Sequence, residues 1–429
     1  MNSLTLPFAS LPVPVLQWKQ QALAWAAEHN ELVAYYEPNQ LNYRYGTFTN
    51  LLGMRRHASS QDITSWEQLQ DQLSQPDNRP LLGYLTYDLK NGLEKLHSQH
   101  PDFIGFPELY FFLPETWLLW AEDALTIYST TEDPEAIARS IAHTPFTASF
   151  SENKVKTVPR VKKEDYLHNV EQLRQHILHG DVYEVNYCQE FYAEQASISP
   201  LALFWKLNQA SPTPFAGFLK LKERYLLCAS PERFLKKSGD LLISQPIKGT
   251  IRRGSTPEED QRQKEQLAAS EKEQAENMMI VDLVRNDLNR VAATGTVQVE
   301  ELFGLYGFKY VWQMISTVTA QLPETVPAVE VLKAAFPMGS MTGAPKIRAL
   351  ELIEQYEQTK RGLYSGSLGY FLPNGDFDFN VVIRSLQYNV ATGYLSFEVG
   401  SAITYDSDPE QEYQECLLKA EAIRNVLAN

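Results

Sequence analysis

Hydrophobic residues in the first 150 positions recur in short aromatic runs rather than at helical spacing. The runs ELVAYYEP, LLGYLTYDL and LYFFLPETWLLWAEDALTIYS have the length and composition of strands. The stretch from Ser65 to Leu73 has the spacing of a helix instead. The pattern predicts an antiparallel sheet with helices packed on it.

A polar, lysine-rich stretch, ASFSENKVKTVPRVKKEDY, follows these runs and has no repeated apolar face. We therefore predict a boundary near residue 155, between an N-terminal region, 1–155, and a second region, 156–429. The second region begins with a helix from Lys163 to His179. The strands VYEVNYCQEFYA, FAGFLKL, RYLLCAS and GDLLISQ come next without a crossover helix between each, which favours antiparallel pairing over a Rossmann-type sheet.

The remaining pattern predicts alternating helices and strands. One long helix starts after Thr256, which is a cap candidate followed by proline and acids, and runs to about Asp287. Another begins at Pro345, after the glycine-rich loop PMGSMTGAPK, and the last spans about Pro409 to Leu427. The strands SLGYFL, FNVVIRSLQYNV and YLSFEVGSAITY lie between the last two helices.

Composition narrows the class of protein. The chain has 429 residues, of which 44% are hydrophobic and 21% charged, as in an ordinary soluble protein. Its 53 acidic and 38 basic residues argue against nucleic-acid binding, because that affinity depends on neutralising phosphates. Three scattered cysteines do not suggest disulfides or zinc, and no apolar run or signal peptide points to a membrane. We expect a cytoplasmic protein.

Two predicted helices carry acids that share a face. Glu273 and Glu276 are three residues apart, and Glu412, Glu415 and Lys419 repeat this spacing near the end of the chain. Two such helices can hold a hard divalent cation such as Mg²⁺. Spacing alone leaves open that each set is solvated surface.

Lys248, in ISQPIKGTIRRG, stands at the end of an apolar strand. It is either a solvated loop charge or a buried amine, and burial would lower its pKa and free it as a nucleophile or base. Glu232, in SPERF, could act as a general acid or base if its strand pairs with that of Lys248.

Arg384 interrupts the apolar run VVIRSL and, if buried, would suit a substrate carboxylate. The loop before Pro345 could hold an anion at a helix start, or be only a tight turn.

The motifs, taken together and in order, resemble those of the chorismate-utilising enzymes. They are GDVYEVNYCQEF, SPERF, QPIKGTIRRG, AENMMIVDLVRNDL, GSMTGAPKIRALELI, YSGSLGYF, VVIRSL and YDSDPEQEYQECLLKA, and they cover about residues 160 to 425. Anthranilate synthases of this family typically have alanine at the position of Lys248, and isochorismate and salicylate synthases usually lack the TGAPK ending. The combination therefore resembles the branch called aminodeoxychorismate synthase component I.

The resemblance implies an α+β fold, with two large antiparallel β-sheets packed face to face and helices on the outside. It implies Mg²⁺-dependent amination of chorismate at C4 with ammonia, which a separate glutaminase subunit makes from glutamine, on the p-aminobenzoate and folate route. In the other branches the product would be anthranilate, or isochorismate or salicylate. A catalytically silent paralogue is a further alternative.

The resemblance also implies residue roles. Lys248 would add to C2 of the ring, and Glu232 would give a proton to the departing hydroxyl. The remaining roles are Mg²⁺ binding by Glu276 and Glu415, with Glu273 and Glu412 in or behind the shell, and substrate binding by Ser340, Tyr364, Arg384, Gly400 and Lys419.

Two positions depart from the family pattern. Gln313 stands where a histidine is usual, and glutamine can hydrogen-bond but cannot shuttle a proton. We expect Gln313 to line the substrate pocket without taking part in proton transfer. Ala402 stands where a second glycine is usual, and its methyl group would crowd a backbone contact to a carboxylate.

Overall fold

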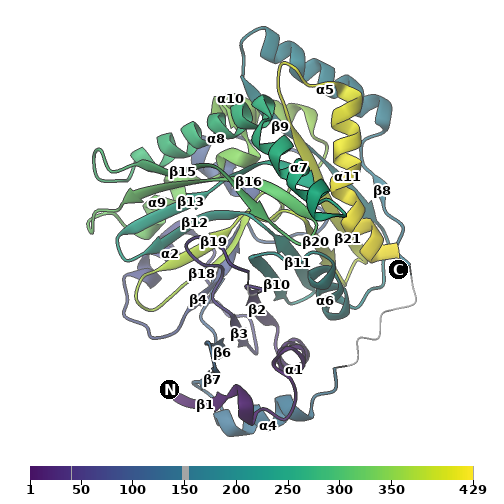
Figure 1. Ribbon diagram of the computed structural model, residues 1–429. Helices are drawn as coiled ribbons and strands as arrows, with labels where there is room; N and C mark the ends of the chain where they lie inside the picture. Colours follow the sequence, from purple (N-terminus) through teal and green to yellow (C-terminus); the bar gives the residue numbers. More distant parts are fainter. Residues whose placement is uncertain (40, 147–153, 429) are drawn as a thin grey trace.

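A computed structural model describes residues 1–39, 41–146 and 154–428. Within these residues, the strands form two antiparallel sheets, sheet A of twelve strands and sheet B of nine (Figure 1). Sheet A has the order β1-β7-β6-β3-β2-β10-β11-β20-β21-β9-β17, with β8 paired to β9. Sheet B has the order β14-β16-β13-β12-β19-β18-β4-β5, with β15 paired to β16. The predicted antiparallel pairing is confirmed.

The strands of sheet A are β1 (Asn2–Pro7), β2 (Leu32–Glu37), β3 (Leu51–Arg55), β6 (Thr116–Trp120), β7 (Ala124–Ser129), β8 (Val158–Pro159), β9 (Glu184–Ala193), β10 (Phe215–Leu221), β11 (Arg224–Ser230), β17 (Gly343–Ala344), β20 (Ser385–Asn389) and β21 (Tyr394–Ile403). Those of sheet B are β4 (Leu81–Leu85), β5 (Leu109–Phe112), β12 (Arg233–Ser238), β13 (Leu241–Gln245), β14 (Ile247–Arg252), β15 (Gln298–Gly307), β16 (Val311–Gln321), β18 (Ser367–Phe371) and β19 (Phe377–Asn380).

The sheets pack face to face through a mainly aromatic and aliphatic layer. Tyr36 of β2 and Tyr370 of β18 pack edge to face, and the Tyr36 hydroxyl donates to the Gly369 carbonyl at 2.6 Å. Apolar side chains of both sheets, such as Leu82 and Leu226, belong to the same buried cluster. Burial of this layer holds the two sheets together.

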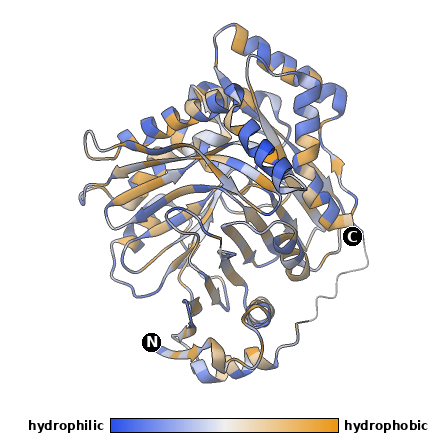
Figure 2. Ribbon diagram, in the orientation of Figure 1, coloured by the Kyte–Doolittle hydropathy of each residue, from blue (hydrophilic) through white to orange (hydrophobic). Residues whose placement is uncertain are grey.

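Helices cover the outer faces of both sheets. On sheet A they are α1 (Val15–His29), α4 (Pro134–His143), α5 (Lys163–Leu178), α6 (Pro200–Ala210), α10 (Lys346–Tyr356) and α11 (Pro409–Ala428). On sheet B they are α2 (Trp66–Leu73), α8 (Glu271–Asn289) and α9 (Ala328–Ala335). The chain also forms α3 (Lys90–Glu94), α7 (Pro257–Ala268) and the 3₁₀ helices η1 (Phe8–Ser10), η2 (Tyr87–Leu89) and η3 (Gly339–Met341). Helices such as α11 carry hydrophilic and hydrophobic residues side by side (Figure 2), as expected for elements with one buried face.

The expected fold class, two large antiparallel sheets with helices outside, is therefore confirmed. Strands β2 to β5, from the first part of the chain, are built into both sheets. The predicted boundary at residue 155 follows directly after residues 147–153, which lie outside the described part of the chain, and the division stays a prediction. Over the described residues, none of the helices combines the length and apolar character that a membrane crossing needs.

Three expectations about the elements are wrong in detail. Helix α6 connects β9 to β10, where the sequence pattern predicted no helix between the strands. The single helix from Thr256 to Asp287 is two helices, α7 and α8, because Ser270 interrupts it and its hydroxyl accepts the Glu273 N–H as a helix cap. The single strand FNVVIRSLQYNV is β19 of sheet B followed by β20 of sheet A. The chain changes sheet at residues 381–384, which hold Arg384 in a left-handed conformation with φ of 52°.

Candidate active site

Lys248 is a buried amine and not a solvated loop charge. It lies on β14, keeps 9% of its surface exposed, and places Nζ 2.6 Å from Glu184 Oε1 on β9. Burial alone would lower its pKa, but the carboxylates of Glu184 and Glu276 outweigh burial and raise the pKa to about 12. The expectation of a lowered pKa is therefore wrong, because several buried acids stabilise the charged amine.

Glu184 was not among the residues that the sequence singled out. Its side chain is 1% exposed, and its second oxygen, Oε2, has no hydrogen-bond partner among the described residues. The available signal was its place in VYEVNYCQEF, where Glu184, Asn186 and Cys188 alternate with apolar residues. That alternation is also what a strand with one solvent-exposed face shows, so it did not identify a buried acid.

Glu232 sits in the connection between β11 and β12, which belong to different sheets. The sequence analysis required that β11, which ends just before Glu232, pair with β14, and this pairing does not occur. The charge of Glu232 nevertheless interacts with that of Lys248. Burial raises the pKa of Glu232 to about 7, against the stabilising effect of Ser340 and Lys248. Such a carboxyl is partly protonated at neutral pH and can donate a proton.

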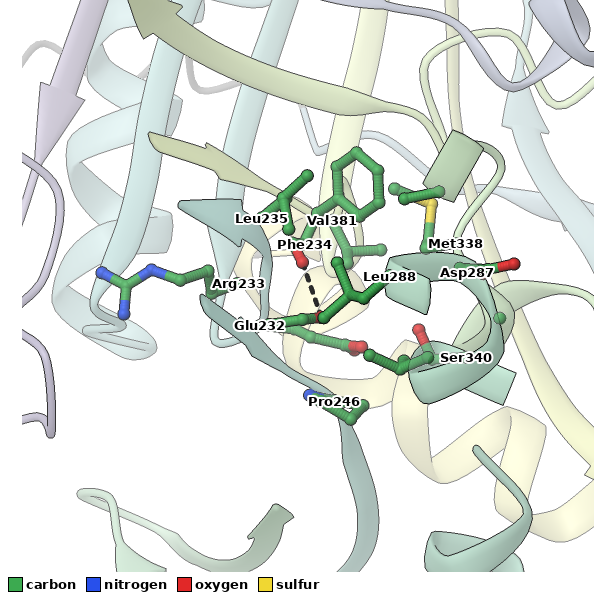
Figure 3. A pocket seen from close by; sticks show the side chains of 14 residues that line it. Glu232, Arg233, Phe234, Leu235, Pro246, Asp287, Leu288, Met338, Ser340 and Val381 are labelled. Atoms are coloured by element: carbon green, nitrogen blue, oxygen red, sulfur yellow. Dashed lines mark hydrogen bonds between the residues drawn. The ribbon is translucent and has the colours of Figure 1, made fainter. Parts of the chain in front are cut away.

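A small cavity lies beside the Glu232 carboxyl. In Figure 3 this carboxyl points toward Ser340 of η3, whereas Arg233 points away and pairs with Asp378 at 2.9 Å. The cavity has a volume of about 20 Å³ and is also lined by Asp287. That volume is enough for about one water molecule, and the lining of the cavity is mainly apolar apart from groups such as Glu232, Ser340 and Asp287.

The four predicted metal ligands lie on α8 and α11, at the edge of this region. Glu276 is buried, and burial raises its pKa to about 7 although Lys248 opposes the shift. The next residue, Asn277, donates to the Lys248 carbonyl at 3.4 Å and so ties α8 to β14. Burial also raises the pKa of Glu273. This end of α8 therefore directs two acids toward the amine.

The acids of α11 already have partners. Glu412 is buried and accepts the Ser407 hydroxyl at 2.8 Å. Glu415 is half exposed and pairs with Lys419 at 2.7 Å, which outweighs burial and lowers the Glu415 pKa. Their positions next to α8 depend on packing between segments more than 130 residues apart.

Lys272 bridges the two acidic helices. Its Nζ lies 3.8 Å from Glu276 Oε1 and 3.9 Å from Glu412 Oε1. Among the described residues, no three His, Cys, Asp or Glu side chains are grouped closely enough to hold a metal ion. The donors nevertheless suit Mg²⁺, because they are carboxylate oxygens and Glu276 Oε1 is buried without a hydrogen bond to another described residue. The Lys272 ammonium, a cation, already lies between the two helices.

The predicted substrate residues fall into two groups. Arg384 and Ser340 both interact with Glu232, and the Arg384 guanidinium has no ion pair with another described residue. Burial lowers the Arg384 pKa, although Glu232 opposes this. A partly buried guanidinium without a paired carboxylate is suited to bind an anionic ligand.

The second group lies on and around β21. Lys419 donates to the Gly400 carbonyl at 2.8 Å, and a side chain at Gly400 would collide with Cys188 Sγ and the Tyr187 carbonyl. Tyr364 is buried, and its hydroxyl lies 3.7 Å from Cys188 Sγ. Glycine is needed at position 400 because β9 approaches so closely.

Gln313 lies on β16, opposite Thr250 of β14. It is 1% exposed, and its Oε1 has no hydrogen-bond partner among the described residues. A buried amide oxygen without a partner is costly unless a ligand satisfies it. Its position two residues along the sheet from Lys248 agrees with the expected place in a pocket, and its role there stays a prediction.

Comparisons with known proteins identify the family. The model of the chorismate binding enzyme family matches residues 30–425. Aminodeoxychorismate synthase component 1 of Salmonella typhimurium is 36% identical over 358 residues, which cover 81% of this chain and 76% of that protein. Anthranilate synthase component 1 of Thermus thermophilus is also 36% identical, over 365 residues that cover 80% of this chain and 76% of that protein. Overall identity thus does not separate the two activities.

Two further likenesses concern length and fold. The chloroplastic aminodeoxychorismate synthase of Arabidopsis thaliana is 44% identical over 280 residues, or 65% of this chain but 30% of that protein. The chain therefore matches less than a third of the length of this plant relative. The crystal structure of anthranilate synthase component I from Streptococcus pneumoniae superimposes with a TM-score of 0.74 and 24% identity, covering 99% of this chain and 92% of that one. With the family match over most of its length, the chain belongs to the chorismate binding enzyme family.

Proposed function

We propose that this chain is an aminodeoxychorismate synthase component I, which aminates chorismate at C4 to give 4-amino-4-deoxychorismate for the p-aminobenzoate and folate route. The observation that carries the proposal is Lys248, a buried amine that contacts Glu184 and lies in the field of Glu232 and Glu276. Anthranilate synthases typically have alanine at this position. A buried lysine among acids supports chemistry that uses the amine.

Lys248 begins the reaction after losing a proton. Its raised pKa keeps it protonated in the resting protein, and Glu184, 2.6 Å away, is the base positioned to take that proton. The free amine then adds to C2 of the ring, while Glu232 gives a proton to the hydroxyl that leaves C4. Ammonia next attacks C4, and the bond between C2 and the lysine nitrogen breaks, which restores the amine.

The pocket residues hold the substrate during these steps. Arg384 binds the pyruvyl carboxylate, and Ser340, Tyr364, Gly400, Lys419 and Gln313 line the pocket. A divalent cation, when held by Glu276 and Glu415 with Glu273 and Glu412 beside them, supplies a Lewis acid for the ring carboxylate. We propose Mg²⁺ because all the donors are carboxylate oxygens.

Ammonia is proposed to come from a separate glutaminase chain. Most free ammonia is protonated at neutral pH and is then no nucleophile. The name component 1, which the Salmonella relative carries, supports a two-component system. The three cysteines are unpaired and buried, which supports a cytoplasmic location.

The product formed from chorismate, ammonium chloride and Mg²⁺ tests the proposal. We expect 4-amino-4-deoxychorismate, identified by mass spectrometry and by conversion to p-aminobenzoate with a lyase. The Lys248→Ala variant should lose the activity, whereas Lys309→Ala, at an exposed lysine, should keep it. Anthranilate as the wild-type product would reject the proposal in favour of the anthranilate synthase alternative, which the Thermus relative represents. If the Lys248→Ala variant is active, Lys248 is not the nucleophile.

A further inference from the structure

A row of polar residues continues along the inner face of sheet A beyond the substrate pocket. Strands β21 and β9 pair so that Gly400 lies opposite Cys188, and Glu398 lies opposite Glu190. Residues two apart on a strand point to the same face and are separated by about 7 Å. Glu398 is therefore the next side chain on this face of β21 after Gly400.

Glu398 is a buried acid without a partner. It is 4% exposed, and no hydrogen bond or ion pair with another described residue involves its carboxyl. The neighbouring acids are paired: Glu190 with Arg160 at 2.9 Å and Glu357 with Arg361 at 2.6 Å. The cations of this region are thus engaged by other carboxylates.

Neither protonation state satisfies this side chain. An ionised carboxylate that is buried without a cation is strongly unfavourable, and a protonated carboxyl has an O–H donor that needs an acceptor. Burial, together with the negative charges of Glu357, Glu190 and Asp88, raises the Glu398 pKa well above its ordinary range, although the charge of Arg361 opposes the shift. The surroundings repel anions and favour a small ligand that is cationic and donates hydrogen bonds.

We propose that Glu398 binds an ammonium ion beside the substrate pocket and accepts one of its protons. The inference rests on the proposed function, in which ammonia is the second substrate. One N–H bond of ammonium breaks, its proton forms an O–H bond on the carboxylate, and the electron pair stays on nitrogen. The products are neutral ammonia and a protonated Glu398, so no further reactant is needed.

The position of Glu398 fits delivery of ammonia to the pocket. Its charge interacts with the thiol of Cys188, and that thiol packs against Gly400 and lies 3.7 Å from the Tyr364 hydroxyl. Glu398 is therefore within one strand repeat of residues proposed to hold chorismate. Ammonia released there would have to move by about one strand repeat, roughly 7 Å, to reach these residues.

The kinetic test uses the full chain with ammonium chloride as nitrogen source. Glu398→Gln removes the acid and keeps the side-chain size, and we expect the KM for ammonium to rise about tenfold or more while the KM for chorismate stays within about twofold. Glu330→Gln is the control, because it removes an exposed acid that pairs with Lys333, and it should leave both KM values unchanged. An unchanged ammonium KM in Glu398→Gln would overturn the inference.

A binding test needs no turnover. At equal ionic strength, ammonium chloride should raise the Tm of the wild type above its value in sodium, potassium or methylammonium chloride by about 1–3 °C, and this difference should vanish in Glu398→Gln. Equal stabilisation by the four salts would overturn the assignment to ammonium. Glu398→Ser, with a smaller side chain, repeats both tests if the glutamine variant does not fold.

The two proposals can fail separately. If the wild type forms no aminated chorismate but shows the ammonium-specific Tm shift, the proposed function is wrong and the ammonium site stands. If amination occurs with the same ammonium KM in wild type and Glu398→Gln, the proposed function stands and the ammonium site is wrong.

Discussion

The amine of Lys248 lies 2.6 Å from the carboxylate of Glu184, and both side chains are buried between the two sheets. The residues are 64 positions apart and come from different sheets, so the face-to-face packing of the sheets creates the pair. The contact keeps the lysine charged at rest and gives its proton a nearby acceptor. The proposed role of Lys248 as a nucleophile can therefore be tested by changing Glu184.

Glu184→Gln should reduce kcat by about 10²-fold or more with little change in the chorismate KM, because the amide cannot accept the lysine proton. The measurement is steady-state kinetics on variants whose circular dichroism matches the wild type. Glu410→Gln, which removes an exposed acid paired with Lys163, should leave kcat unchanged. Full activity of Glu184→Gln would rule out its role as the base.

Glu232 should give the rate a pH dependence. With a pKa of about 7, its protonated form is lost above neutrality, so kcat should fall as the pH rises through about 7. Because this pKa lies above the ordinary value of 4.5, the stability due to this group is fully present below about pH 4.5 and is lost as the pH rises to about 7. Denaturant unfolding at several pH values should show that the free energy of unfolding decreases less with rising pH in Glu232→Gln than in the wild type. An equal dependence of this free energy on pH in both proteins would contradict the raised pKa.

Lys272→Met should tighten divalent-cation binding. The Lys272 ammonium lies within 4 Å of Glu276 and Glu412, where its charge competes with a metal ion. Its side chain is half exposed, so the gain should be limited to about 0.2–1 kcal/mol, or at most about fivefold in Kd. Mn²⁺ titration followed by electron paramagnetic resonance measures it.

The control for this metal titration is Lys264→Met, because Lys264 lies on α7 against the Trp312 ring and away from the acids. Its Kd should equal that of the wild type. Weaker binding by Lys272→Met would instead mean that Lys272 helps to organise the acids for the metal.

Arg384→Gln should weaken chorismate binding without destabilising the fold. The Arg384 guanidinium has no ion pair with a described residue, and its burial lowers its pKa, so the charge is unfavourable in the free protein. We expect the chorismate KM to rise about tenfold or more, and Tm to stay equal or increase. Thermal unfolding and saturation kinetics test the two parts, and a lower Tm with an unchanged KM would contradict both.

Much of the fold follows from local pattern. The ends of α5 and α11 and the antiparallel pairing of β10 with β11 and of β12 with β13 are properties of nearby residues, which hydrophobic periodicity and caps report. Helix α6 between β9 and β10 was not predicted, although its Ser199 cap and Pro200 are local signals as well. The break at Ser270 is a local feature too, but its cap competes with a helical pattern that continues on both sides. The motifs also identified the family, because their order and spacing can be read directly from the sequence.

The chemistry of the site depends on contacts that no local pattern contains. The sequence by itself determined that Lys248, Glu232 and the acid pairs are present and on which elements they lie. Only the tertiary structure decided that Glu184 faces the lysine, that the lysine pKa rises, that Arg384 lies where the chain changes sheet, and that Glu398 is buried without a partner among the described residues. The reason is that pKa and burial are set by neighbours in space, and sheet packing brings those neighbours from distant parts of the chain.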